Sequence, residues 1–114
     1  MAEKFVTLRN APNEILKAID DAVLKGSVSA SLESSHDFAA DDVYCYVRVY
    51  ERFSYAGSNR VSMTVTLFCC CDRCELLAVT SGGSQAMFFK INTWGEEAFL
   101  ESIDSAISPF LDER

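Results

Sequence analysis

Residues 43–71, VYCYVRVYERFSYAGSNRVSMTVTLFCCC, decide the fold. Apolar and polar side chains alternate from Val43 to Tyr55 and again from Arg60 to Cys71, and a period of two is typical of half-buried strands. The small and polar residues AGSN at 56–59 lie between these runs, as in a hairpin turn. The segment therefore predicts two long antiparallel strands joined by a short turn.

Further strands are predicted on both sides of this hairpin. Residues 28–33 alternate between apolar and polar side chains and indicate a strand, whereas residues 34–42 are polar and indicate a loop. A strand is expected over about residues 74–81, and the short apolar run at 86–91 is a candidate for one more.

Two helices are predicted, one before the strands and one after them. Pro12 to Lys25 carries an apolar stripe at helical spacing, with the proline in the first turn. Thr93 and Glu96 match a capping box, and the apolar stripe that follows is interrupted by Pro109. We expect the second helix to kink or end just before that proline.

These elements predict one α+β domain over residues 1–114. Short connections between strands imply antiparallel neighbours. The simplest solution is an antiparallel meander of about four to five strands, with an N-terminal and a C-terminal helix packed on one face.

Composition and charge exclude several classes of partner. The 114 residues are 49% hydrophobic and carry a net charge of −7, which disfavours nucleic acid and anionic membranes as partners. No apolar run approaches the roughly 18–20 residues that span a bilayer, and no signal peptide is recognised. The odd number of cysteines, five, does not suit a disulfide framework and favours a cytoplasmic location.

The two long strands each sort into an apolar and a more polar set of side chains. We expect the two apolar sets to share the core face, because a one-residue slip moves every side chain to the other side. An odd connection, or a bulge near Glu51, would place Val49 opposite Val65 or Leu67 and align the two sets.

Four of the five cysteines lie within residues 69–74, and the same alignment places Cys45 opposite Cys69 or Cys71, with Cys70 on the other face. We interpret Cys45, Cys69, Cys71 and Cys74 as small apolar residues of the core. The alternative is a zinc or redox site on the same four, because Cys71 and Cys74 have the spacing of half a zinc knuckle. The chain lacks a second such motif.

A set of aromatic and basic side chains on one strand face is the first candidate for a partner surface. Tyr and Arg are enriched where protein surfaces bind partners, and a second copy of the chain is the simplest partner. The alternative is a solvent-facing sheet of good strand formers. The residues are Tyr44, Tyr46, Arg48, Tyr50 and Arg52.

The glycine loop Ser81–Gln85 is the second candidate for a binding site. The backbone N–H groups of Gly82 and Gly83 would cradle an anion. The loop matches neither nucleotide fingerprint and lacks the lysine of a P-loop, so a simple turn is the alternative. His36 and its neighbouring aspartates show no nucleophile motif, and we assign no catalytic residue and no cofactor.

The chain resembles a small bacterial family of uncharacterised cytoplasmic proteins. The resemblance covers nearly the whole chain and is carried by the order of RVY at 48–50, SNR at 58–60, SGGSQ at 81–85, FF at 88–89 and WGEE at 94–97. The family has no established activity, so the resemblance implies no catalytic role. The cysteines are not part of its pattern.

The sequence therefore favours a binding module over an enzyme. We expect it to self-associate as a homodimer through the Tyr/Arg face or the glycine loop. The alternative function is a thiol-based metal-binding or redox protein that uses Cys45, Cys69, Cys71 and Cys74.

Overall fold

The computed structural model describes residues 1–54, 59–82 and 96–112. Its helical elements are α1 (Pro12–Gly26), the helical residues 96–101, α3 (Asp104–Ile107) and the 3-10 helix η1 (Ser108–Phe110). Its strands are β1 (Ala2–Arg9), β2 (Ser31–Ala40), β3 (Val43–Ser54), β4 (Asn59–Cys70) and β5 (Arg73–Gly82).

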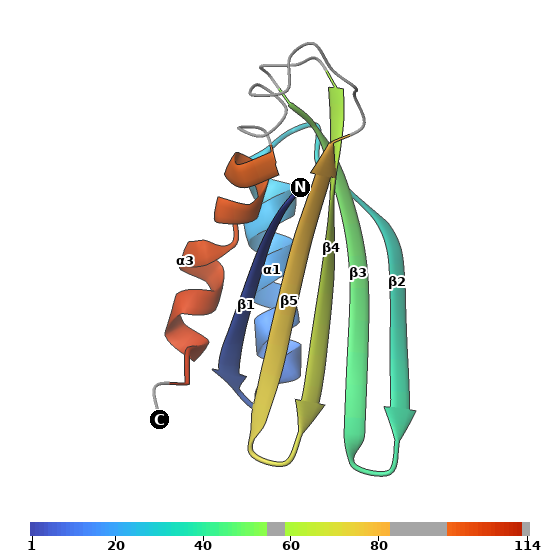
Figure 1. Cartoon of the computed structure of the whole chain (residues 1–114), viewed down its shortest axis with the longest axis vertical. Helices are drawn as coiled ribbons and strands as arrows, with labels where there is room; N and C mark the ends of the chain where they lie inside the picture. Colours follow the sequence, from blue (N-terminus) through green and yellow to red (C-terminus); the bar gives the residue numbers. More distant parts are fainter. Residues whose placement is uncertain (55–58, 83–95, 113–114) are drawn as a thin grey trace.

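The five strands form one antiparallel sheet in the order β1-β5-β4-β3-β2 (Figure 1). Strands β2 to β5 are a meander, and β1 pairs with β5 from Ala2 opposite Thr80 to Arg9 opposite Arg73. The predicted α+β class and antiparallel meander are confirmed. The described chain begins with a strand, however, so α1 is its second element and not an N-terminal helix.

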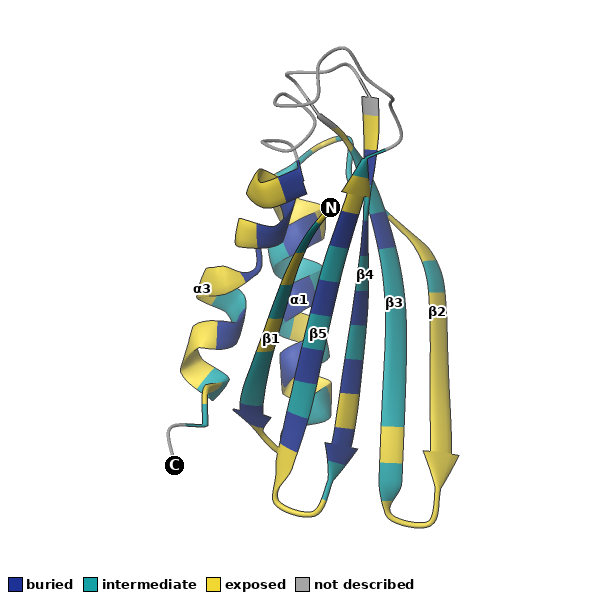
Figure 2. Ribbon diagram, in the orientation of Figure 1, coloured by how far each residue is buried: buried dark blue, intermediate teal, exposed yellow. Residues whose placement is uncertain are grey.

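The edge strand β2 differs from the sequence prediction. It covers Ser31–Ala40, so the loop expected over residues 34–42 is wrong for most of its length. Figure 2 shows that β2 is largely exposed, because it lies at the edge of the sheet. A register shift between Leu32 and Ser34 marks a bulge in β2.

One cluster of buried apolar side chains joins the helices to one face of the sheet. Buried residues alternate with half-buried ones along β4 and β5 (Figure 2), as the period of two requires. The apolar stripes predicted for the two helical segments are confirmed, because α1 and the C-terminal segment bury residues of these stripes against the sheet. These are Ile15, Ile19, Val23, Phe99, Leu100, Ile103 and Ile107.

The C-terminal segment is less regular than the single helix predicted. A turn at 102–103 separates the helical residues 96–101 from α3, and Pro109 lies in the first turn of η1. Pro109 therefore ends the regular helix where expected. Thr93, the predicted cap, and the apolar run 86–91 lie outside the described residues.

The pairing of β3 with β4 contradicts the expected register. Ser54 lies opposite Asn59, so the connection has four residues, and Val49 lies opposite Thr64 instead of Val65 or Leu67. The predicted odd connection or bulge near Glu51 is wrong. The apolar sets of β3 and β4 consequently lie on opposite faces of the sheet.

Candidate interaction surface

The Tyr and Arg side chains predicted as a partner surface lie on the helix side of β3, where each pairs with a buried residue of β4. Tyr50 is fully buried and donates a hydrogen bond to the carboxylate of Asp20 on α1. The guanidinium of Arg52 lies 4.5 Å from the ring centroid of Phe99, and burial lowers its pKa. Tyr50 and Arg52 therefore fasten the helices to the sheet.

The other three members of the set lie toward the opposite end of β3. The rings of Tyr44 and Tyr46 are stacked at 6.4 Å, and Tyr44 is exposed. Arg48 donates a hydrogen bond of 2.7 Å to Asp37 on β2. Partial burial raises the pKa of Tyr46, with a smaller contribution from the charge of Asp37. The structure thus divides the predicted surface into a packed half and a more open half.

The opposite face of the sheet carries no helix of the described residues. In Figure 1 it is the near face, with α1 behind it. The register places half-buried, uncharged side chains of the three central strands β3, β4 and β5 in two adjacent rows. We call these six residues the open-face centre: Val47, Val49, Thr64, Thr66, Leu77 and Val79.

Four phenylalanines surround the open-face centre. Phe5 lies opposite Leu77, and Phe68 lies opposite Cys45, which in turn lies opposite Phe38 on β2. Phe53 lies at the far end of β3. Their exposed fractions are 59% for Phe5, 58% for Phe38, 51% for Phe53 and 42% for Phe68. Exposed apolar patches on soluble proteins are often interaction sites, which makes this face the candidate surface.

Charged side chains on this face lie at its margins. At one end the guanidinium of Arg60 binds the carboxylate of Glu51 at 2.9 Å and lies 5.1 Å from the ring centroid of Phe53. Glu3 lies on the edge strand β1, and Glu75 lies near the turn between β4 and β5. The face thus has an uncharged centre of four apolar side chains and two threonines, with charged side chains at its rim, an arrangement that is also common in protein interfaces.

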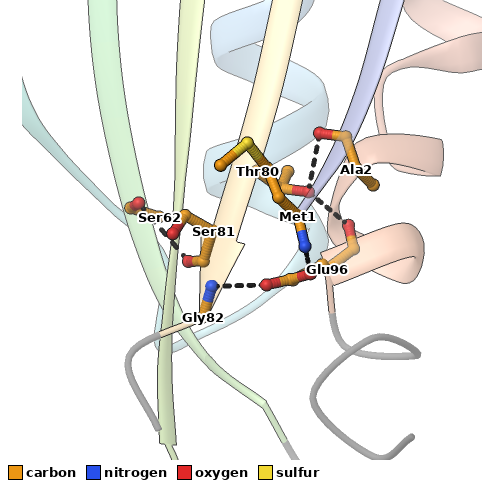
Figure 3. A network of polar contacts seen from close by, with 7 residues as sticks. All are labelled: Met1, Ala2, Ser62, Thr80, Ser81, Gly82 and Glu96. Carbon is orange, nitrogen blue, oxygen red and sulfur yellow. Dashed lines mark hydrogen bonds and ion pairs between the residues drawn. The ribbon is translucent and has the colours of Figure 1, made fainter. Parts of the chain in front are cut away.

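The glycine loop is only partly described, because Gly83 lies outside the described residues. The amide of Gly82 donates a hydrogen bond of 2.6 Å to a carboxylate oxygen of Glu96, whose other oxygen contacts the amino group of Met1 (Figure 3). The hydroxyl of Thr80 donates to the backbone oxygen of Glu96 at 3.0 Å. The amide expected to cradle an external anion therefore holds a carboxylate of the chain itself.

The four cysteines of the alternative metal site are not brought together. Cys69 and Cys74 form a buried disulfide on the helix side, Cys45 lies opposite Phe68 on the open face, and Cys71 is in the turn. Cys70 lies on the face opposite its neighbour Cys69, as predicted, but Cys45 lies on the same face as Cys70, so the expected pairing of Cys45 with Cys69 or Cys71 is wrong. Among the described residues, no group of three or more potential ligands could hold a metal ion.

The open face was not predicted as a whole. Its β4 residues belong to the more polar set that was expected to face away from the core, whereas its β3 residues do not. Val47 and Val49 belong to the apolar set of β3 that was assigned to the core. Phe5 and Phe38 gave no usable pattern, since the first belongs to a strand that was not predicted and the second to a segment expected as a loop. The even register of β3 and β4 is the observation that turns these residues outward.

Comparisons with known proteins place the chain in a family. No helix among the described residues is long and apolar enough to cross a bilayer. No curated protein matches the chain. The model of DUF6054, a family of unknown function, matches residues 1–110. The match covers almost all of the sequence, and the chain belongs to this family.

Proposed function

We propose that this chain is an interaction module that forms a homodimer by packing the open faces of two sheets together. The observation that carries the proposal is the open-face centre, six uncharged side chains ringed by exposed phenylalanines. Burial of such a surface is the main favourable term in protein association.

The size of the face suits a stable dimer. Five strands at about 4.8 Å spacing and a shared length of about eight residues give a face of about 24 by 27 Å. Each copy would bury about 650 Å², or about 1,300 Å² for the pair, which falls in the range of specific interfaces. A two-fold axis would bring the same patch of both copies together.

The chemistry of the face suits a second sheet as the partner. Two sheets pack at about 10 Å with interdigitating side chains, and the protruding rings of Phe5, Phe38 and Phe68 would fill the space between them. The ion pair of Glu51 with Arg60 would remain at the solvated rim. Both sets of helices would lie on the outside.

The test is sedimentation velocity of the wild-type chain and of Thr66→Arg over a range of concentrations. Thr66 lies in the middle of the open-face centre. An arginine at this position would place a charge without a partner in the middle of the interface between the two chains. We expect the wild type to sediment as two chains and Thr66→Arg to weaken association by about a hundredfold.

The matched control is Val28→Arg, which adds the same side chain at a fully exposed position outside the sheet. It should dimerise as the wild type does, and circular dichroism should show that both variants are folded. A wild-type chain that sediments as one copy at every concentration, or equal behaviour of the two variants, would contradict the proposal.

The stacked pair of Tyr44 and Tyr46 on the helix side is a second candidate surface, supported by the exposure of Tyr44. Tyr46→Ala separates the two surfaces. Loss of the dimer in Tyr46→Ala but not in Thr66→Arg would assign the interface to the helix side.

A further inference from the structure

The turn between β4 and β5 holds two free thiols in contact. The Sγ atoms of Cys70 and Cys71 lie 3.1 Å apart, where β4 ends and the turn begins. Both thiols line one pocket of about 340 Å³, a size within the range of small-molecule sites. The remaining lining residues are Phe68, Asp72, Arg73 and Glu75.

The two thiols differ in access. Cys71 is exposed and occupies the first position of the turn, where its φ of 64° is a left-handed conformation that few residues other than glycine adopt. Cys70 is half-buried. The hydrogen bond with Cys71, and then burial, raise the pKa of the Cys70 thiol. A reagent in solution therefore reaches Cys71 first.

The other cysteines lack this arrangement. Cys69 and Cys74 are joined to each other and buried on the opposite face of the sheet, so neither can take part while that bond is intact. Cys45 is half-buried in β3, and its strand partners Phe38 and Phe68 offer no sulfur. Among the described residues, Cys70 and Cys71 are therefore the only two free thiols that contact each other.

We propose that Cys71 is a modification site for small-molecule disulfides of the glutathione class, and that Cys70 is the thiol that resolves the adduct. The inference rests on the geometry of the turn and does not require the proposed dimer, although Phe68 of the pocket also borders the open-face centre. Exchange of this kind proceeds through a mixed disulfide.

The steps balance without another reactant. The thiolate of Cys71 attacks one sulfur of the small disulfide, a bond forms between them, and the first small thiolate leaves and takes up the proton that Cys71 lost. The Cys70 thiol then gives up its proton, and its thiolate attacks Cys71 Sγ. The bond between Cys71 Sγ and the second small thiolate breaks, and that thiolate leaves and takes up the proton. The Cys70–Cys71 pair loses two electrons, which reduce one small disulfide to two thiols.

The test uses the full chain with its Cys69–Cys74 disulfide intact and oxidised glutathione as the probe. Samples are quenched with acid and followed by intact mass spectrometry, and unreduced digests identify the modified residue. For the wild type we expect a transient adduct of one glutathione on Cys71, followed by loss of the adduct and formation of a Cys70–Cys71 disulfide.

Two variants separate the roles of the thiols. Cys70→Ser should trap the adduct on Cys71, whereas Cys71→Ser should slow adduct formation by about tenfold or more, because only the half-buried Cys70 remains at the turn. Cys45→Ser is the matched control, which removes a free thiol elsewhere and should behave as the wild type does.

A first adduct on Cys45 or Cys70 of the wild-type chain would overturn the proposal. So would an adduct on Cys70→Ser that disappears as fast as that of the wild type, because nothing would then assign resolution to Cys70. Mapping the first adduct on the wild-type chain needs no variant, so the proposal stays testable if Cys71→Ser fails to fold.

Discussion

The hydroxyl of Tyr50 donates a hydrogen bond to the carboxylate of Asp20 and so joins the only polar atom of a fully buried ring on β3 to the flank of α1. Tyr50 lies among core residues, whereas Asp20 is half-buried. The bond satisfies a phenol that would otherwise be buried without a partner, and it fixes the helix against the sheet.

Tyr50→Phe should lower the free energy of unfolding by about 1 kcal/mol. The ring remains in the core, and the exposed side of Asp20 regains water, so only the hydrogen bond is lost. Urea unfolding measures the change. Tyr44→Phe is the control, since the Tyr44 ring is exposed and its loss of a hydroxyl should leave stability unchanged. Equal effects of the two variants would contradict this assignment.

The same residue predicts a loss of stability in alkali. Burial, followed by the hydrogen bond and charge of Asp20, raises the pKa of Tyr50 far above its ordinary value of 10.0. Above about pH 10 the unfolded chain loses the phenolic proton while the folded chain keeps it, so unfolding becomes more favourable by about 1.4 kcal/mol per pH unit. Urea unfolding from pH 9 to 11 should show a shallower fall for Tyr50→Phe, and parallel curves would contradict the prediction.

The Cys69–Cys74 disulfide should stabilise the turn between β4 and β5 modestly. It closes a loop of about six residues, for which the chain-entropy model gives about 2 kcal/mol. The double variant Cys69→Ala with Cys74→Ala should lose this amount in urea unfolding, and reduction of the wild type should lower its stability in the same way. Cys45→Ala serves as the control, and a reduced wild type as stable as the oxidised one would refute the prediction.

Glu96 should be important for the junction of β1, β5 and the C-terminal helical segment. Its carboxylate is largely buried and accepts the Gly82 amide at 2.6 Å. Glu96→Gln removes the charge from this bond and from the contact with the Met1 amino group, so we expect a loss of about 1–3 kcal/mol.

Glu97→Gln is the matched control for Glu96→Gln, because the neighbouring side chain is exposed. Thermal unfolding of both variants checks the prediction. A lower midpoint for Glu97→Gln than for Glu96→Gln would show that the network in Figure 3 does not limit stability.

Much of the secondary structure could be predicted from the sequence, because most elements carry their own pattern. Helix α1 has the stripe of Ile15, Ile19 and Val23, and β4 alternates strictly. β1 was missed because Lys4 lies on the helix side and Phe5 on the open side, which reverses the expected alternation. Most of β2 was missed, and only residues 31–33 fall in the predicted strand, because an edge strand that buries little has no apolar pattern along most of its length.

The faces of β3 could not be predicted because its side chains are amphipathic. Tyrosine and arginine have apolar bodies and polar tips, so they fit the margin of a core as well as valine does. Tyr50 and Arg52 take the helix side, where Asp20 and Phe99 meet their polar ends. Asp20 and Phe99 belong to other elements, so the sequence pattern of β3 alone could not predict these contacts. The error in the faces moved the candidate site from one side of the sheet to the other.

The place of β1 in the sheet has a consequence for synthesis. β1 is the first of the five strands to be synthesised, but its strand partner β5 begins only at Arg73. The hydrogen-bond partners of its Lys4 and Arg9 side chains, Asp104 and Pro109, come later still. The meander β2 to β5 can form from sequential hairpins, whereas β1 must wait until β5 has been synthesised. Of the five strands, the first to be synthesised is thus the last to gain a strand partner, and the pairing of β1 with β5 is a contact of long sequence separation that slows completion of the sheet.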